Sequence, residues 1–272
     1  MAILNVTLGS FLDVLLLPFR DLPPIAGLAA VSLLTALAML VVVRFTSDQA
    51  GIAAAKQAIV AALFEIRLFN DDLPAVFRAQ FEMLRQNAIY LRLSLVPMLW
   101  MIVPIALVLT HLEGHYGYAG LTPGQPVLVK AAVSGSQAPN DAALDAPDPV
   151  HVSTPAVWFP VARELVWKVT PERAGDFILS ARINGVSYTK TLDATDRVVR
   201  RSPERVAPGL VAEFLHPSER PLPGEAAVTS ITVAYPTREV SIFGWQMSWL
   251  VVYFVFSMIF AFLLKKPLGV AM

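Results

Sequence analysis

The sequence predicts an α+β membrane protein with three transmembrane helices, a cytoplasmic antiparallel coiled-coil hairpin and an extracytoplasmic antiparallel β-sandwich domain. Three observations support this prediction. Three long segments contain no charged residue, heptad-spaced apolar residues follow the first of them, and short alternating segments with Pro and Gly turns precede the last. The chain is 56% hydrophobic and only 15% charged, which is a low charged fraction for a soluble domain.

The uncharged segments are 25–43, 93–110 and 245–264. Each has close to the ~20 residues that a helix needs to cross a bilayer. We therefore expect transmembrane helices at 25–43, 93–111 and 244–264. The first segment has neither the basic start nor the small-residue cleavage site of a signal peptide, so we expect it to be retained as a span.

Basic residues at the ends of these segments predict their orientation. Arg44 and Arg92 flank the connection between the first two spans, and Lys265 and Lys266 follow the third. Short loops rich in Lys and Arg stay in the cytoplasm. The resulting organisation is an N-terminal interfacial segment at 1–24, a cytoplasmic helical hairpin at 44–92, an external domain at 112–243 and a cytoplasmic tail at 265–272.

Residues 11–19 of the N-terminal segment are apolar around a single acidic residue, Asp13, and include Pro18. They are too few to cross a bilayer. We expect a short amphipathic helix that lies in the outer membrane interface. The alternative is a loosely packed N-terminus.

The connection between the first two spans carries two apolar stripes with alternating spacings of three and four residues, as at the a and d positions of a coiled coil. Asp72 and Pro74 lie between the stripes, within a turn at 70–74, and are suited to the start of a helix. We expect two antiparallel helices that pack through these stripes. The stripes are Ile52, Ala55, Ile59, Ala62, Ile66 and Phe69, then Phe77, Phe81, Leu84, Ala88 and Leu91.

The external domain has its clearest signal at 177–192, where apolar and polar residues alternate on both sides of Asn184-Gly185. Asn-Gly favours a type I′ turn, which pairs Ile183 with Val186 in a β-hairpin and Ala181 with Tyr188. Further strands are expected at 127–133, 164–169 and 228–235. Residues 134–155 and 218–224 are expected to be exposed loops.

The sequence contains no nucleophile elbow, phosphate-binding Gly loop or catalytic carboxylate pair, so we do not expect an enzyme. The absence of cysteine excludes disulfides and thiolate metal sites. His111 and His115 have the spacing of two ligands on one helix face, but no third ligand is near in the sequence. We therefore expect interfacial histidines rather than a metal site, and no cofactor.

The net charge is zero, which gives no reason to expect a nucleic acid as a partner. One local cluster is basic and consists of Arg197, Arg200, Arg201 and Arg205. We interpret it as a solvated charged segment, in preference to a patch that binds lipid phosphates or an acidic partner.

The order of these parts resembles the Oxa-type membrane protein insertase superfamily, to which the YidC insertase and subunit three of the endoplasmic reticulum membrane complex belong. The likeness covers 23–120 and the third span. It rests on topology and on four short segments: Arg-Phe-Thr-Ser-Asp-Gln at 44–49, Leu-Pro-Ala-Val-Phe-Arg at 73–78, Ser-Leu-Val-Pro at 94–97 and Ile-Val-Pro at 102–104. The resemblance does not account for the external β-domain.

The resemblance implies a groove between the three spans that lowers the cost of moving polar groups through hydrocarbon. Pro97 and Pro104 would bend the second span, and Arg44, Arg92, Lys265 and Lys266 would stand at the cytoplasmic mouth. Many insertases carry a basic residue inside the groove, and these spans have none. The groove-lining candidates are Ser32, Thr35, Ser94, Ser248 and Ser257.

An alternative explanation is that Ser32, Thr35 and Ser257 are small residues that let the helices pack closely. Under the resemblance, the function would be assisted insertion or assembly of membrane proteins. Its partners would be membrane lipids and client proteins, with ribosome or nascent-chain contact through the hairpin.

The competing hypothesis is a non-catalytic accessory subunit of a larger membrane complex, which uses the insertase-like core as a scaffold and docks through the β-domain. A third hypothesis, an envelope sensor, lacks any signalling module in the hairpin. The layout and the cysteine-free external domain favour the bacterial inner membrane.

Overall fold

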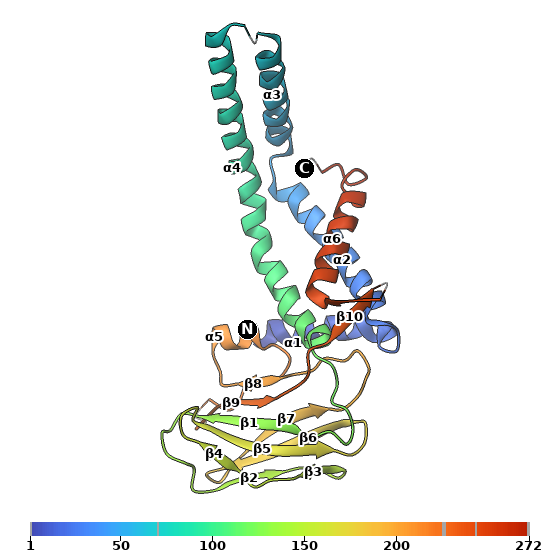
Figure 1. The fold of residues 1–272 in the computed structure, drawn as a ribbon, viewed down its shortest axis with the longest axis vertical. Helices are drawn as coiled ribbons and strands as arrows, with labels where there is room; N and C mark the ends of the chain where they lie inside the picture. The colour runs from blue at the N-terminus through green and yellow to red at the C-terminus, as the bar shows by residue number, and fades with distance from the viewer. Residues whose placement is uncertain (1, 70, 225–226, 243, 271–272) are drawn as a thin grey trace. The chain divides into compact units, whose positions relative to one another are not determined.

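The computed structural model describes residues 2–69, 71–224, 227–242 and 244–270 (Figure 1). It is an α+β structure with antiparallel β-sheets and long apolar helices, which confirms that part of the prediction. The chain divides into two compact units. We call Met1–Gly27 with Leu107–Leu250 the β unit, and Leu28–Ala106 with Val251–Met272 the helical unit.

The helices include one that is much longer than the others, α4, which continues without a break from the predicted hairpin into the predicted second span. A short π-helical turn, η2, follows it at Glu113–Gly117. The helices are α1 (Ala2–Leu16), η1 (Leu17–Phe19), α2 (Pro24–Thr46), α3 (Gln49–Leu68), α4 (Leu73–Leu112), α5 (Leu210–Leu215) and α6 (Trp249–Leu264).

The strands belong to the β unit and pair in an antiparallel manner. They are β1 (Val127–Val133), β2 (Ala142–Asp145), β3 (Val150–Val152), β4 (Val157–Phe159), β5 (Glu164–Pro171), β6 (Asp176–Ile183), β7 (Val186–Asp193), β8 (Glu204–Val206), β9 (Val228–Val233), β10 (Glu239–Ile242) and β11 (Trp245–Ser248).

Two sheets share one hydrophobic core, an arrangement compatible with a β-sandwich. The larger sheet has the order β3-β5-β1-β9-β8, with β4 also paired to β5, and the smaller has the order β2-β6-β7. Trp167 and Val169 of β5 and Leu179 of β6 are all buried in this core. Alternate residues of β1, β5 and β6 are buried, as expected for sheets with one buried face.

The predicted hairpin at 177–192 is confirmed with its register. Ile183 pairs with Val186 and Ala181 with Tyr188. Asn184 and Gly185 both have positive φ angles, of 51° and 79°, as a type I′ turn requires.

Residues 134–155, predicted to form a loop, contain the two short strands β2 and β3. Leu144 of β2 pairs with Ala181 and is buried, as is Val150 of β3. The two strands are only four and three residues long, which is too short for a period-two pattern to stand out in the sequence. The prediction of a structureless loop was therefore wrong.

The third predicted span begins later than expected. Residues 245–248 form strand β11 and pair with β10 across a turn at Gly244, whose φ is +85°. Helix α6 therefore starts at Trp249, and its 16 residues are fewer than a straight span needs. Helices of spanning length and apolar composition are found at 24–46 and 73–117 among the described residues, which is weakly compatible with membrane association.

Helix α1 is longer than the predicted 11–19 segment and ends at Leu16. Leu12 and Leu16 are buried on one face, while Phe11 and Val14 are exposed on another. The amphipathic pattern was correct, but the structure places the helix earlier in the chain.

Helices α3 and α4 run antiparallel, and the Lys56 ammonium lies 5.4 Å from the centroid of the Tyr90 ring (Figure 1). Asp48 caps α3 through the amide of Gly51, and Asp72 accepts from the amide of Ala75 at the start of α4. The predicted start of the second hairpin helix is thus confirmed, although Asn70 of the predicted turn lies outside the described residues.

The two predicted stripes of the hairpin differ in outcome. Ile52, Ala55 and Ala62 of the first stripe are buried. The second stripe is exposed, with Phe77 at 67% and Phe81 at 70%, and the buried residue in this part of α4 is Ala79. The pairing through Phe77, Phe81, Leu84, Ala88 and Leu91 was therefore wrong.

Candidate functional site

The helical unit contains a pocket of about 210 Å³ between α2, α4 and α6. Its wall is apolar apart from hydroxyl groups, and it contains no charged side chain. The lining residues are Thr35, Ala36, Met39, Leu40, Val43, Met101, Ile105, Tyr253, Phe254, Ser257 and Ala261.

Three hydroxyl groups meet at this pocket. The Tyr253 hydroxyl of α6 interacts with the side chains of Thr35, from α2, and Ser257, one turn further along α6. Thr35 and Ser257 were both predicted from the sequence as groove residues, and both line the pocket. The Ser257 hydroxyl oxygen is fully buried and the accessible surface of the pocket is almost wholly apolar, so these hydroxyl groups contact one another rather than face the cavity.

Ser32 lies next to the pocket but not in its wall. Its side chain is fully buried, and its hydroxyl donates to the carbonyl oxygen of Tyr253 at 3.2 Å. A small hydroxyl residue that bonds across two apolar helices allows close packing. Ser32 therefore fits the alternative explanation, helix packing, better than it fits a groove surface.

The other two predicted groove residues do not line this pocket. Ser94 is half-buried on α4, well before Met101, the first pocket residue of that helix. Ser248 ends strand β11 in the β unit, and its hydroxyl accepts from the amide of Leu250. Its assignment to the third span was wrong because the chain pairs with β10 there.

Three of the predicted mouth residues, Arg44, Lys265 and Lys266, lie at or just after helix ends, whereas Arg92 lies in the middle of α4. Arg44 is exposed in the last turn of α2, and Lys265 follows α6 with its ammonium 4.6 Å from the centroid of the Phe262 ring. Val270 packs against Leu40 and Val43 near these ends. Lys266 and Arg92 are both exposed.

Pro97 and Pro104 both lie inside α4, which continues through them. Each removes one backbone hydrogen bond from the helix and so lowers its resistance to bending. Met101 of the pocket wall lies between the two prolines, and Ile105, the other pocket residue of α4, directly follows Pro104.

His111 and His115 both contact the N-terminal helix α1. His111 contacts the carbonyl oxygens of Leu107 and Asn5 through its two ring nitrogens. His115 contacts the carbonyl oxygen of His111 and, at 2.9 Å, the Asp13 carboxylate. All four ring nitrogens have protein partners, which gives these residues a structural role.

Asp13 also forms an ion pair with Arg200 at 3.2 Å. Partial burial acts to raise the pKa of Asp13, but the hydrogen bond with His115 and the charge of Arg200 outweigh it. The pKa of this carboxyl is therefore lowered. A carboxylate that stays ionised keeps α1 attached to the end of α4 and to the β unit.

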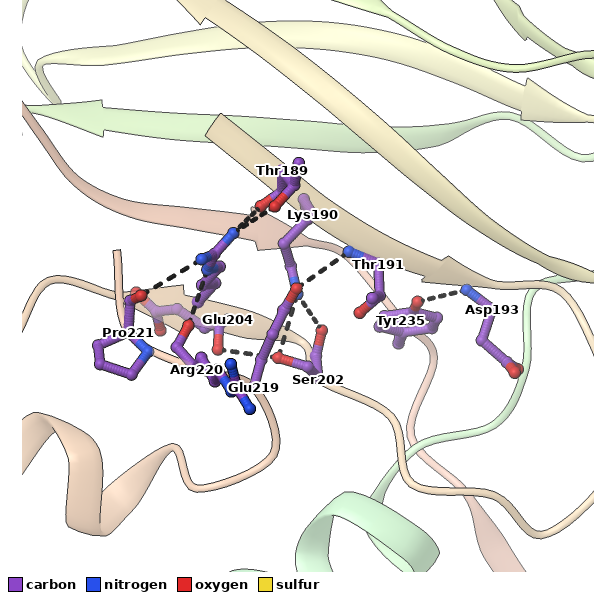
Figure 2. Close-up of polar contacts among 11 residues, drawn as sticks. Thr189, Lys190, Thr191, Asp193, Ser202, Glu204, Glu219, Arg220, Pro221 and Tyr235 are labelled. Atoms are coloured by element: carbon purple, nitrogen blue, oxygen red, sulfur yellow. Dashed lines mark hydrogen bonds and ion pairs between the residues drawn. The ribbon is translucent and has the colours of Figure 1, made fainter. Parts of the chain in front are cut away.

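The basic cluster is not a solvated segment, as the sequence had suggested. The Arg201 side chain is fully buried and donates to Asp193 at 2.8 Å. Arg205 donates to Thr189 and to two carbonyl oxygens (Figure 2). Arg197 is the most exposed member and pairs with Asp21.

A second buried charge, Lys190, lies close to this cluster. Its ammonium donates to Ser202 and, at 2.5 Å, to the Glu219 carboxylate (Figure 2). Burial lowers the pKa of Lys190, while Glu219 acts to raise it. These contacts bind the segment that contains α5 to strand β7.

Two carboxylates meet at the end of the smaller sheet. A hydrogen bond with Asp193, together with partial burial, raises the pKa of Asp176 to about 6. Asp193 is in turn held by Arg201. Among the described residues, no group of three or more His, Asp or Glu side chains is placed to hold a metal ion.

Tyr253 is the pocket residue that the sequence analysis missed. It lies four residues before Ser257 and therefore on the same helix face. A hydroxyl-bearing aromatic residue one turn from a serine, inside an uncharged segment, was the available signal.

No family model matches the chain, and neither a curated protein nor a solved structure matches it.

Proposed function

We propose that this chain is a multi-pass membrane protein that assists the insertion or assembly of other membrane proteins, without a covalent step. The observation that carries this proposal is the pocket between α2, α4 and α6, in which hydroxyl groups lie in an apolar wall. A polar group of a client segment that took over the contacts among these hydroxyl groups would be satisfied at a depth where an unsatisfied group costs several kcal/mol.

The helical surfaces support membrane embedding. The exposed fractions of Leu99, Trp100 and Val103 of α4 are 60%, 68% and 61%. Leu34 and Leu37 of α2 are also exposed. Apolar side chains exposed around long helices are stable in lipid and not in water.

The lining of the pocket favours varied occupants. Met39 of α2 and Met101 of α4 both line it. Methionine is flexible and polarisable, and therefore adapts to different shapes. A site that must accept many client segments needs this adaptability more than it needs one rigid fit.

The orientation follows from the basic residues at the helix ends. We place Arg44, Arg92, Lys265 and Lys266 on the cytoplasmic side, with the α3–α4 hairpin, and the β-sheets outside. This orientation corresponds to the inner membrane of a bacterium.

A second function is favoured by a specific observation on the hairpin. Phe77, Phe81 and Leu84 of α4 are exposed, as are Phe64 and Leu68 of α3. Exposed apolar surface of this extent, outside the apolar spans, is typical of a surface that binds another protein. An accessory subunit of a larger complex would cover it with a fixed partner.

Photocrosslinking in cells distinguishes the two functions. A photoreactive residue at Thr35 or Ser257 probes the pocket, and one at Leu34, exposed on α2, is the matched control. Assisted insertion predicts short-lived adducts with many newly made membrane proteins from the pocket positions and not from Leu34.

An accessory subunit predicts a different result. One partner would dominate at fixed stoichiometry, both at the pocket and from a probe at Phe81. The same set of adducts from Thr35 and Leu34 would show that the pocket has no special role, and it would contradict the insertion proposal.

A further inference from the structure

The β unit carries two short helices with exposed apolar faces. On α1, Val6, Phe11 and Val14 are 47%, 60% and 71% exposed. On α5, Leu210 and Val211 are 73% and 72% exposed. Large apolar side chains that are exposed to this extent on the β unit are typical of a surface that is covered by a partner or by lipid.

The two helices are joined to each other. The Asn5 side-chain amide of α1 donates to the carbonyl oxygen of Glu213 in α5 at 2.8 Å. Asn5 is 7% exposed, so this bond is shielded from solvent. Figure 1 shows α1 and α5 along the same edge of the β unit, above the sheets. They therefore form one continuous surface.

This surface lies where the two long apolar helices end. Helix α2 starts at Pro24, with four residues between it and η1, so Pro24 must lie within about 18 Å of Phe19. At the end of α4, His111 contacts the carbonyl oxygen of Asn5. A helix tied to the ends of two spans has to lie at the level of the membrane boundary.

A polar pocket of about 190 Å³ separates the two helices. Arg200, Arg220 and His216 line it together with Ser10. Two carboxylates are also present: Glu219, which is paired with Lys190, and Glu213. Arg200 is paired with Asp13 and His216 lies 3.8 Å from Glu204, so Arg220 and Ser10 would make the main contacts with a phospholipid phosphate, while its acyl chains would contact the apolar side chains of the two helices.

We propose that α1 and α5 together form a membrane-facing platform that lies in the head-group region of the outer leaflet, with lipid phosphates in the pocket between them. The occupant of the apolar surface is the bilayer itself. The platform would hold the β unit at the membrane surface through contacts with lipid, in addition to its covalent links to the spans. This inference needs the spans of the proposed function but not the insertion activity.

The test uses site-directed fluorescence, because the chain has no cysteine and single cysteines can be labelled cleanly. The environment-sensitive fluorophore NBD is attached to the full chain at Val14→Cys or Val211→Cys. Val161→Cys, on a fully exposed turn of the β unit, is the matched control, and Leu99→Cys on α4 reports membrane embedding.

Each labelled protein is reconstituted into nanodiscs of phosphatidylcholine and phosphatidylglycerol that contain nitroxide-labelled lipid. With the nitroxide on the head group, we expect quenching at Val14 and Val211 to exceed that at Val161 by at least roughly threefold. With the nitroxide deep in the acyl chain, the strongest quenching is expected at Leu99.

The outcomes separate the two proposals. If Leu99 is quenched by the deep nitroxide and Val211 is no more quenched than Val161, the chain spans the membrane but the platform is wrong. If Leu99 is not quenched, the membrane spans and the platform both fail. A blue-shifted but unquenched label at Val211 would mean that protein covers the surface, which also overturns the platform.

Discussion

The two units bury polar side chains in opposite ways. The β unit buries full charges, such as Lys190 and Arg201, each with several partners. In the described part of the helical unit, the buried polar groups are neutral hydroxyls, such as those of Ser32 and Tyr253. The reason is the supply of hydrogen-bond partners. Loops and strand ends offer free carbonyl groups, while a helix uses its own internally.

The difference shows how each unit can be specialised. A buried charge can hold a loop in one position, as Lys190 does for the segment around Glu219. Neutral hydroxyls in an apolar pocket impose little cost when they change partners. The buried charges therefore fix loop geometry in the β unit, whereas the proposed function would require the hydroxyl contacts of the helical unit to exchange.

The largest expected effect comes from the buried pair. Lys190→Met leaves the Glu219 carboxylate without its cation, and we expect the free energy of unfolding to fall by about 3–5 kcal/mol. Thermal unfolding of the purified protein, followed by circular dichroism, measures the change.

The double variant Lys190→Met/Glu219→Leu should recover much of this loss, because it removes both charges. Glu82→Gln breaks the exposed ion pair with Arg85 and should leave the unfolding temperature unchanged. If Lys190→Met unfolded at the same temperature as the parent protein, the claim that buried charge pairs stabilise the β unit would be wrong.

The next effect tests packing in the helical unit. Ala79 is 1% exposed, and Ala79→Leu is expected to cost about 1–3 kcal/mol by overpacking α4. Ala88→Leu, on the exposed stripe, is the matched control and should be neutral. Chemical denaturation of both variants in the same detergent gives the comparison, and equal destabilisation would mean that the contact face has been misassigned.

A smaller effect is expected at the attachment of α1. Asp13→Asn weakens the contacts with His115 and Arg200, at a cost of about 1–2 kcal/mol, or roughly 5- to 30-fold faster amide exchange in α1. Hydrogen exchange followed by mass spectrometry reports it peptide by peptide. Asp21→Asn, from the exposed pair with Arg197, should leave α1 protected. Equal exchange in the two variants would rule out the attachment.

The smallest effect is a change in pH dependence. The pKa of Asp176 is raised from 3.8 to about 6, so the folded protein binds more protons than the unfolded chain between these values. The stabilisation of the folded protein by Asp176 is present below the pKa that this group has in the unfolded chain, and it is lost as pH rises through about 6. Asp176→Asn should therefore flatten the fall in unfolding temperature over this range. A slope identical to that of the parent protein would show that Asp176 titrates normally.

The sequence predictions were accurate where neighbouring residues determine the structure, and they failed where residues far apart in the sequence contact one another. The register of the hairpin around Asn184-Gly185 was predictable because two adjacent residues determine it. The start of α4 at Asp72 was local as well. The partners of Arg201 are spread over Asp193, Tyr118 and Thr195, and no sequence pattern joins them.

The hairpin shows a second limit. Residues Phe77 and Phe81 form a more hydrophobic stripe than the face around Ala79, and both faces have helical spacing. Periodicity identifies stripes but not the stripe that contacts a partner helix. At the pocket, Thr35 and Ser257 could be found because hydroxyls are rare in apolar spans, whereas the role of Ser248 depended on a strand pairing.

The continuity of α4 has a mechanical consequence. The helix runs from Leu73 to Leu112, and Pro97 lies near the pocket wall. About 36 Å of helix separates Pro97 from Leu73. A bend of about ten degrees at this proline would swing the far tip by roughly 6 Å. A small bend at Pro97, about one helical turn from the pocket residue Met101, would therefore be amplified into a large displacement at the tip of the hairpin.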